Sequence, residues 1–235
     1  MKDLFGKAIL DFQTKNSPED LITETTISEE DEMSVAYLFR SYDEMPHMEQ
    51  KALQLAKGKI LDVGCGAGSH SLSLQNERNL DVTSIDISPN AIHACTLRGL
   101  KKAKVQDVLT LENEKYDTIL LLMNGAGMCG KLKNIPNFLL KLKTLLNPGG
   151  QILLDSSDII YMFDDAEDGG KWIPSQNEYY GEIVFNISYK GEKEKPFDWM
   201  FIDYNTLQNA ALDNGLQCEL ILEGEHFDYL AKLSI

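Results

Sequence analysis

The hydrophobic and polar positions of this 235-residue chain follow two different patterns, one on each side of about residue 58. Beyond that point, short apolar runs typical of buried strands alternate with longer segments in which apolar residues recur at helical spacing. This alternation predicts parallel strands joined by helical crossovers, because parallel neighbours need a long return connection. The predicted strands cover residues 59–64, 81–86, 103–107, 116–123 and 151–157, and the predicted helices cover about 69–77, 88–99 and 135–146.

The segment before residue 58 favours helices. Ser17-Pro18 has the form of a helix start, with serine as the cap and proline at the first helical position. Ser28 and the three acidic residues after it repeat this pattern before an apolar series that ends at Phe39. A third helix is expected over about 48–57, ended by Gly58. These helices should form a cap over the carboxyl edge or the flank of the sheet.

After residue 158 the pattern changes again. Segments 182–189 and 197–204 partly alternate apolar and polar residues around a charged loop, which predicts an antiparallel hairpin. Residues 205–214 should form a helix, and 216–224 and 227–235 a final antiparallel pair. Before the fifth strand, the residues at 147–150 (Asn-Pro-Gly-Gly) predict a tight turn.

The predicted fold class is therefore α/β. We expect a Rossmann-like, doubly wound, mostly parallel sheet of seven strands whose last strand is antiparallel, with N-terminal helices and an inserted β-hairpin. Residues 1–235 should form a single domain, since the length and apolar content suit one core. Its expected parts are a helical cap (1–57), a core (58–158), an inserted lid and hairpin (159–204) and a C-terminal helix with two strands (205–235).

Composition and charge narrow the partners. The formal net charge of −15 makes the average surface repel phosphates and anionic lipids, so a nucleic-acid partner is disfavoured. No apolar stretch approaches the roughly 20 residues that cross a bilayer, and the first residues lack a secretory cleavage pattern, so a cytoplasmic protein is expected. The four cysteines and four histidines are scattered, and we expect no metal site and no disulfide framework.

The most informative chemistry lies where the first predicted strand ends. Residues 61–68 read LDVGCGAG, in which three alternating glycines permit a tight turn before a helix and let a ligand approach bare backbone. Asp86 ends the second predicted strand, where a carboxylate can accept both hydroxyl groups of a ribose. The two features should lie side by side at the carboxyl edge of the sheet, which predicts a nucleoside site.

Two other nucleotide motifs fit less well. A dinucleotide fingerprint needs glycine or alanine at position 69, where this chain has serine. Asp62, two residues before the first glycine, would gain nothing beside a pyrophosphate. A P-loop requires Gly-Lys-Ser/Thr, which does not follow these glycines.

Four segments together resemble the class I S-adenosylmethionine-dependent methyltransferases. Residues 61–68 are similar to the family's first motif, 85–92 (IDISPNAI) to its second, 105–107 (VQD) to its third, and 146–158 (LNPGGQILLDSSD) to its turn and fifth strand. The resemblance covers about residues 59–155 and continues more weakly to the C-terminus. It implies that S-adenosyl-L-methionine is the methyl donor and S-adenosyl-L-homocysteine the product.

The resemblance also implies roles at the amino-acid end of the cofactor. Gly64, Cys65 and Gly66 would present their backbone to the methionine part. Asp62 would orient the amino-acid end. Arg40, near the end of a cap helix, is a candidate partner for the cofactor carboxylate.

The remaining implied contacts follow the next three strands. Asp86 would bind the ribose, and Ile87 would pack on the adenine face. Asp107, with the neighbouring Gln106, would accept a hydrogen bond from the adenine amino group. Asn124, at the end of the fourth strand, would lie near the sulfonium.

The acceptor side departs from the better-defined subclasses. The segment from Asn124 to Gly127 lacks the proline-containing motifs that the resemblance associates with methylation of adenine amines or cytosine C5, and its small residues leave space near the methyl group. An aromatic and acidic stretch after the fifth strand has two interpretations. It can lie above the methyl donor as a mobile lid that suits a small, cationic or amine-bearing acceptor, or it can be a flexible acidic loop whose aromatic residues pack the inserted lobe. Its residues are Tyr161, Phe163, Asp164, Asp165, Glu167, Asp168, Trp172, Tyr179 and Tyr180.

The resulting prediction is an S-adenosylmethionine-dependent methyltransferase that acts on a small molecule by in-line methyl transfer. No catalytic residue is selected; His70, a lid acid or a tyrosine can serve if a base is required. The alternatives are a methyltransferase acting on RNA or protein, a non-catalytic S-adenosylmethionine-binding protein and, disfavoured by Ser69, a dinucleotide-dependent oxidoreductase. The sequence leaves the oligomeric state open.

Overall fold

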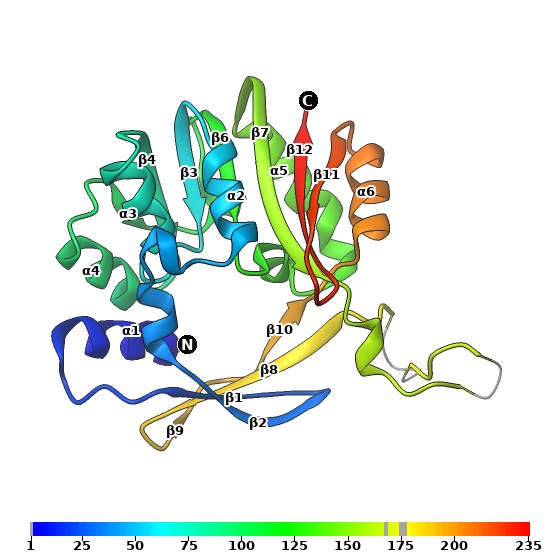
Figure 1. The fold of residues 1–235 in the computed structure, drawn as a ribbon, viewed down its shortest axis with the longest axis horizontal. Helices are drawn as coiled ribbons and strands as arrows, with labels where there is room; N and C mark the ends of the chain where they lie inside the picture. Colours follow the sequence, from blue (N-terminus) through cyan, green and yellow to red (C-terminus); the bar gives the residue numbers. More distant parts are fainter. Residues whose placement is uncertain (1, 167–168, 174–177) are drawn as a thin grey trace.

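Five neighbouring parallel strands form one side of the main sheet, and two C-terminal strands complete the other side (Figure 1). The structure is a computed structural model that describes residues 2–166, 169–173 and 178–235. Within these residues the main sheet has the predicted number of seven strands, and their order is β11-β12-β7-β6-β3-β4-β5. The parallel strands are β3 (Lys59–Val63), β4 (Asp81–Asp86), β5 (Ala103–Val105), β6 (Tyr116–Leu121) and β7 (Leu146–Ser157).

The C-terminal strands close the other side of this sheet. β12 (Asp228–Ser234) pairs antiparallel with β7, and β11 (Gln217–Glu223) pairs antiparallel with β12. This confirms the predicted antiparallel end of the chain. The residues at 147–150 do not form a turn before the strand, because β7 already begins at Leu146. They form an irregularity inside β7, where the register with β6 shifts and Gly149 has a φ of 74°.

Five helices of the core lie where the pattern predicts them. They are α2 (His47–Leu55), α3 (Ser69–Asn76), α4 (Pro89–Leu97), α5 (Ile135–Thr144) and α6 (Tyr204–Asp213). Side-chain caps begin two of them. The Ser88 hydroxyl accepts the Ala91 N–H at 2.9 Å at the start of α4, and Asp203 accepts the Thr206 N–H at 3.0 Å at the start of α6.

The two faces of the main sheet have separate cores because neighbouring residues of a strand point in opposite directions. Ile119 and Leu121 of β6 belong to the core that packs against α5 and α6. Leu120, between them, belongs to the core that packs against α2 and α3. Helices therefore cover both faces, which explains why these strands read as continuous apolar runs.

The N-terminal segment corrects part of the prediction. It begins with helix α1 (Leu4–Thr14), but the two expected helix starts near Ser17 and Ser28 are wrong. The chain there forms an antiparallel hairpin of β1 (Leu21–Thr25) and β2 (Ser28–Met33). The Ser28 hydroxyl lies 2.7 Å from that of Thr25 across the turn, where the capping pattern had placed a helix. The β-branched residues of β1 favour a strand and outweigh the capping signal.

Short 3-10 helices follow this hairpin. The apolar series that ends at Phe39 forms only η1 (Val35–Phe39), and η2 (Tyr42–Glu44) precedes α2. Further 3-10 helices connect the core elements: η3 (Val108–Thr110), η4 (Gly125–Cys129), η5 (Leu132–Asn134) and η6 (Ile160–Met162). The N-terminal cap is therefore a mixture of helices and strands.

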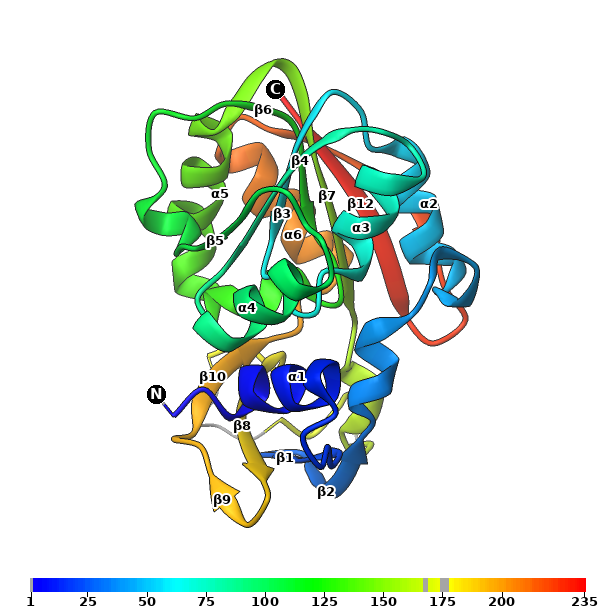
Figure 2. The same ribbon diagram turned by 90° about the vertical axis from the view of Figure 1, so that its left-hand side faces the viewer.

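The inserted hairpin joins the N-terminal one in a second, small sheet. β8 (Glu182–Tyr189) pairs antiparallel with β10 (Phe197–Met200) as predicted, and a short β9 (Glu192–Lys193) also pairs with β8. β8 pairs on its other side with β1, giving the order β10-β8-β1-β2. We call these strands and β9 the small sheet. It lies across the end of the main sheet toward which β3 points, with α1 between the two (Figures 1 and 2).

No helix within the described parts of the chain combines the length and the apolar character needed to cross a membrane.

Candidate active site

The glycine turn after β3 is held in shape by the end of β4. Gly64, Gly66 and Gly68 have positive φ angles of 71°, 52° and 82°, which glycine adopts without steric cost. The N–H groups of Gly64 and Cys65 donate to the carbonyl oxygen of Ile85 at 2.9 and 3.1 Å. A Cβ atom at Gly66 would meet no atom within 4 Å, so open space lies beside the turn. The turn can offer a ligand its carbonyl oxygens and its bare Cα surface.

Asp86 joins this turn to the start of α4. One carboxylate oxygen accepts the Gly66 N–H at 3.0 Å and the other accepts the Ser88 N–H at 2.8 Å. Burial raises the pKa of Asp86, and these two hydrogen bonds oppose the rise. Each carboxylate oxygen keeps lone-pair capacity for a further donor. The predicted proximity of Asp86 to the glycine turn is therefore present.

Exposed apolar side chains lie near Asp86. Ile87, Val105 and Leu109 are 57%, 52% and 53% exposed, although such side chains are usually buried. Val105 is the register partner of Asp86 across β4 and β5. This part of the edge thus combines a carboxylate with apolar surface that a flat ring can cover.

Gln106 and Asp107 follow β5 at the same edge. The Gln106 amide donates to the Thr110 hydroxyl at 2.7 Å, and Asp107 accepts the Leu109 N–H at 2.8 Å. Asp107 therefore caps η3, and its second carboxylate oxygen is available to a ligand donor. Four of the predicted contact residues, at positions 86, 87, 106 and 107, thus lie at the carboxyl ends of the neighbouring strands β4 and β5.

Asp62 lies deeper than the other predicted residues. It is 2% exposed and accepts the Ser71 hydroxyl at 2.6 Å, and that hydroxyl is 2.7 Å from the Ser84 hydroxyl. Burial raises the pKa of Asp62, which His70 and Ser71 oppose. Within the protein, Asp62 thus ties β3 to α3 and supports the glycine turn from below.

A strained corner follows β6. Met123 and Asn124 have φ angles of 61° and 59°, a conformation that costs non-glycine residues about 1–2 kcal/mol each. Their N–H groups donate to the two carboxylate oxygens of Asp155 at 3.1 and 2.9 Å. The Asn124 side chain accepts the Ser156 hydroxyl at 2.8 Å and donates to the Met200 carbonyl at 3.2 Å. Asn124 therefore links β6, β7 and the small sheet.

Arg40 lies in a buried chain of charged groups. Its Nη2 donates to the two carboxylate oxygens of Glu49 at 2.6 and 2.7 Å, and one of these oxygens is 2.6 Å from Nε2 of His70. Nη1 donates to the Tyr37 carbonyl at 2.6 Å. The Nε of Arg40 is buried and has no hydrogen-bond partner among the described residues. One donor of this guanidinium is thus free for a ligand acceptor.

The protonation of this chain follows from its contacts. Burial favours a raised pKa for Glu49, but His70 and Arg40 outweigh it and lower the pKa. Burial favours a lowered pKa for His70, but its hydrogen bond to Glu49 and the charges of Asp62, Glu49 and Asp155 outweigh it and raise the pKa. The raised pKa favours the protonated form of His70, which makes His70 a weaker candidate for a general base.

The small sheet contacts η4 directly. A Cβ atom at Gly127 would lie 2.1 Å from the Trp199 ring, so the indole packs against bare backbone. A Cβ atom at Gly64 would lie 3.3 Å from the Met128 sulfur, which places this side chain over the glycine turn. Trp199 and Met128 thus lie next to η4, which begins directly after Asn124.

Helix α1 packs against the start of α4. A Cβ atom at Gly6 would lie 1.9 Å from the Ser88 hydroxyl, which explains the glycine in this helix. The Asp3 carboxylate accepts hydrogen bonds from the Asn90 N–H and side-chain amide at 3.2 and 2.9 Å. The N-terminal segment therefore lies next to the loop that carries Asp86 and Ile87.

The predicted lid lies elsewhere. Residues 158–166, which follow β7, lie on the side of β11 and β12 (Figure 1). Tyr161 stacks on Phe227 of the turn between those strands, with ring centroids 5.0 Å apart. Tyr179 and Tyr180 bond to Asp203 and Asp158 at 2.7 and 2.8 Å. These contacts do not place the aromatic residues above the methyl donor. Glu167 and Asp168 lie outside the described residues.

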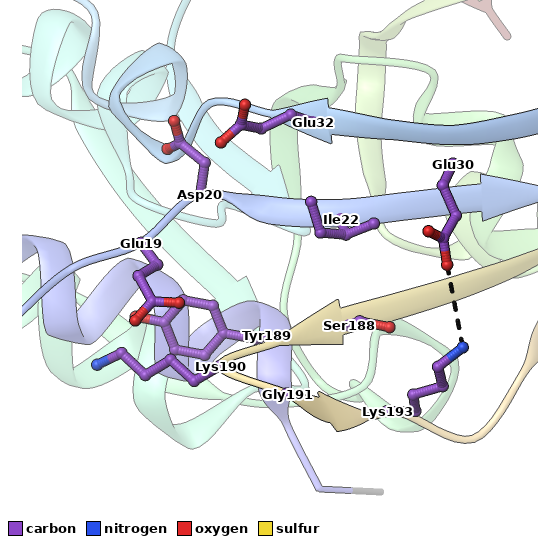
Figure 3. Close-up of a pocket in the computed structure, with 10 residues that line it drawn as sticks. All are labelled: Glu19, Asp20, Ile22, Glu30, Glu32, Ser188, Tyr189, Lys190, Gly191 and Lys193. Atoms are coloured by element: carbon purple, nitrogen blue, oxygen red, sulfur yellow. Dashed lines mark ion pairs between the residues drawn. The ribbon is translucent and has the colours of Figure 1, made fainter.

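The small sheet carries a separate hollow of about 450 Å³ (Figure 3). Glu19, Asp20, Glu30 and Glu32 line it together with Lys190 and Lys193. Lys193 pairs with Glu30 at 4.0 Å, and Lys190 pairs with Asp11 at 2.7 Å. This acidic hollow shares no residue with the glycine turn, and we assign it no part in the site.

No group of three histidine, cysteine, aspartate or glutamate side chains within the described part of the chain is arranged to hold a metal ion. All four cysteines are free.

Sequence reasoning missed Glu49 and Asp155. Asp155 stands near the carboxyl end of a predicted strand, where ligand-binding residues of such sheets gather, and this position was an available signal. Glu49 lies inside α2, and its partners Arg40 and His70 come from other elements. A single acidic residue in a helix gives no sequence pattern from which such an ion pair can be predicted.

Comparison with known proteins identifies relatives of the whole chain. A family model described as a methyltransferase domain matches residues 36–189. The crystal structure of an S-adenosylmethionine-dependent methyltransferase from Bacteroides fragilis in complex with S-adenosyl-L-homocysteine is 45% identical. The match covers 100% of this chain and 95% of that chain, with a TM-score of 0.91.

Two curated relatives are more distant. The tRNA U34 carboxymethyltransferase of Pseudoalteromonas translucida is 27% identical over 122 residues, which are 48% of this chain and 34% of that protein. The ubiquinone biosynthesis O-methyltransferase of Xanthomonas oryzae pv. oryzae is 27% identical over 115 residues, which are 44% of this chain and 45% of that protein. This chain therefore spans less than half of the length of these curated relatives.

Proposed function

Because this chain belongs to the S-adenosylmethionine-dependent methyltransferases, we propose that it methylates a small molecule held between the main sheet and the small sheet. The observation that supports this acceptor most directly is the contact of Trp199 with Gly127. It brings the small sheet against η4, directly after the residue expected near the reacting methyl group. A covered edge suits a small acceptor better than a long polymer.

Three observations fit S-adenosylmethionine as the cofactor of this site. Open space beside Gly66 lies next to the Asp86 carboxylate. The buried Nε of Arg40 has no partner among the described residues and matches the cofactor carboxylate. Exposed apolar surface at Ile87 matches the adenine ring.

From these observations we assign the contacts as follows. Asp86 binds the ribose, and Ile87 with Gln106 and Asp107 binds the adenine. The backbone of Gly64, Cys65 and Gly66 contacts the methionine part, which Asp62 supports through the turn. Arg40 binds the carboxylate through its free donor, and Asn124 lies near the sulfonium.

The cofactor, when bound, supplies a methyl group on a positively charged sulfur that is already a good leaving group. The contribution of the protein is then to align an acceptor with that methyl group and to exclude water, and alignment can supply several kcal/mol. Trp199 and Met128 provide apolar walls for this purpose. Asn124, fixed by Ser156 and Met200, keeps the corner after β6 in place.

The histidine and tyrosines that the sequence offered as bases are poorly suited to take a proton from the acceptor. The raised pKa of His70 favours its protonated form beside Glu49. The hydroxyl groups of Tyr179 and Tyr180 bond to carboxylates, and burial raises the pKa of both. We therefore propose an acceptor that reacts as a neutral nucleophile or delivers its proton to solvent.

A calorimetric titration tests the cofactor assignment. The native chain should bind S-adenosylmethionine and S-adenosylhomocysteine with micromolar-range affinity, and Asp86→Ala should lose or greatly weaken both. Asp81→Ala is a matched control, because Asp81 begins the same strand and pairs at the surface with Lys102. Unchanged binding in Asp86→Ala would overturn the assignment of Asp86.

An acceptor screen tests the rest of the proposal. Formation of S-adenosylhomocysteine should appear with a member of a small-molecule panel containing phenols, amines and carboxylic acids. Transfer RNA and unfolded protein should give only the background rate, since the net charge of −15 opposes RNA binding. Turnover with RNA or protein alone would replace the small-molecule assignment, and cofactor binding without turnover on any acceptor would favour a non-catalytic binding protein.

A further inference from the structure

Three carboxylates at the candidate site have no cationic partner. Asp62, Asp86 and Asp155 form no ion pair within 4.0 Å among the described residues, whereas Glu49 close by is paired with both Arg40 and His70. Burial raises the pKa of each of the three. A buried carboxylate without a counter-charge is costly, and a cationic ligand reduces that cost. The edge of the main sheet therefore has a local excess of negative charge.

Asp155 is the member of this set that holds the corner after β6. Its two oxygens accept the N–H groups of Met123 and Asn124 at 3.1 and 2.9 Å. Asn124 is the residue that the proposed function places near the sulfonium. Asp155 thus lies one hydrogen bond away from the residue that is expected beside the reacting sulfur.

We propose that the Asp155 carboxylate makes the site prefer the positively charged sulfonium of the methyl donor over the neutral thioether of the product. This inference rests on the proposed function, because it requires the cofactor to bind beside Asn124. S-adenosylmethionine and S-adenosylhomocysteine differ by one methyl group and one charge, so a fixed anion near the sulfur is a direct way to distinguish them. Asp155 is accordingly a specificity-determining residue that promotes release of the product.

The groups around Asp155 come from α2, α3, β12, the corner after β6 and the segment after η1. Glu49 of α2 raises the pKa of Asp155, while His70 of α3 and the two corner amides lower it. Tyr229 of β12 also experiences the Asp155 charge. Arg40, after η1, reaches the same corner through a contact of 3.9 Å with the Met123 sulfur. Glu49 with its lowered pKa remains ionised near neutral pH, so its titration does not overlap with that of Asp155.

This titration gives the inference a pH signature. Burial is the main cause that raises the pKa of Asp155 to about 6. Above that pH the carboxylate is charged and attracts the sulfonium; below it the proton removes the attraction. The affinity for S-adenosylmethionine relative to S-adenosylhomocysteine should therefore rise as the pH rises through about 6. The amino and carboxylate groups are common to both ligands, so their titration cancels in the ratio.

The test is calorimetric titration of both ligands between pH 5 and 7.5, with the native chain, Asp155→Asn and Asp155→Glu. In the native chain the ratio of the two dissociation constants should shift by about tenfold toward S-adenosylmethionine across this range. Asp155→Asn should abolish the shift, and Asp155→Glu, which restores the charge, should recover part of it. Asp117→Asn is the matched control. Asp117 is the second residue of β6, lies at the opposite edge of the sheet and also accepts a backbone N–H, that of Lys59.

The outcomes separate the inference from the proposed function. If the native chain binds neither ligand, the proposed cofactor site fails. If it binds both but the ratio is independent of pH, or is the same in Asp155→Asn, the inference is wrong while the site stands. If Asp155→Asn weakens the binding of both ligands equally, Asp155 only supports the corner after β6, and the inference is also wrong. Circular dichroism and thermal unfolding confirm that each variant is folded.

Discussion

At the scale of single residues, the buried chain of Arg40, Glu49 and His70 is a feature whose stability depends on every one of its charges. The Arg40 and Glu49 side chains are 8% and 6% exposed, so neither charge is relieved by water. Removing the anion leaves a guanidinium buried without compensation. We expect Glu49→Gln to lower the free energy of unfolding by about 3 kcal/mol near neutral pH, measured by urea denaturation.

The pH dependence of that loss has a definite sign. The pKa of Glu49 is lowered in the folded protein, so its contribution is present above its ordinary value of 4.5 and disappears as the pH falls through the lowered pKa. The pKa of His70 is raised, so its contribution is full below its ordinary value of 6.5 and disappears as the pH rises through the raised pKa. The difference between native and variant should be greatest between about pH 4.5 and 6.5. Glu29→Gln on exposed β2 should leave the urea midpoint unchanged, and a similar loss there would contradict this account.

At the scale of elements, the contact between β10 and η4 decides how the small sheet sits on the core. Gly127→Ala places a methyl group where the Trp199 ring lies, and the ring must move. We expect a loss of about 1–3 kcal/mol in unfolding free energy and a larger proportional loss of turnover than of cofactor affinity. Denaturation monitored by tryptophan fluorescence and a cofactor titration measure the two effects.

A second substitution isolates that contact. In the Trp199→Ala variant the space beside Gly127 is free. The double variant should therefore have almost the same unfolding free energy as the single Trp199→Ala variant. Additive losses in this double-mutant cycle would show that the two residues act independently.

Local sequence predicted most of the core elements and the hairpin of β8 and β10, but not the pairing of that hairpin with β1 in the small sheet. The structures of β3, β6 and the glycine turn can be predicted from their own residues. The strands are apolar throughout, and the turn needs the glycines that it contains. Asp86 was placed beside that turn for the same reason, since both follow neighbouring strands. β1 depends on β8, which lies more than 150 residues away in the sequence. A capping pattern at Ser17 or Ser28 contains no information about such a distant partner strand. The pairing of Glu49 with Arg40 and His70 could not be predicted for the same reason.

At the scale of the whole molecule, ligand binding and folding are coupled through the site. S-adenosylhomocysteine at 100 times its dissociation constant should stabilise the folded chain by about 2.7 kcal/mol. For a chain of this length the corresponding rise in Tm is about 5–10 °C, measured by differential scanning calorimetry. Adenosine triphosphate at the same concentration is the control, because its phosphates would meet the unpaired carboxylates at the edge. An equal rise with that nucleotide would contradict the assigned cofactor.

The small sheet is assembled from the two flanks of the core, and this has a consequence for synthesis. Residues 21–33 leave the ribosome long before β8 exists, so the first hairpin cannot gain its main partner until residue 189 has been made. The loop between them is closed most easily after the core has drawn its ends together. The small sheet is thus assembled late in folding. A nascent chain that ends before β8 exposes the acidic hairpin of β1 and β2 without its partner strand, and this hairpin must stay soluble until β8 is synthesised.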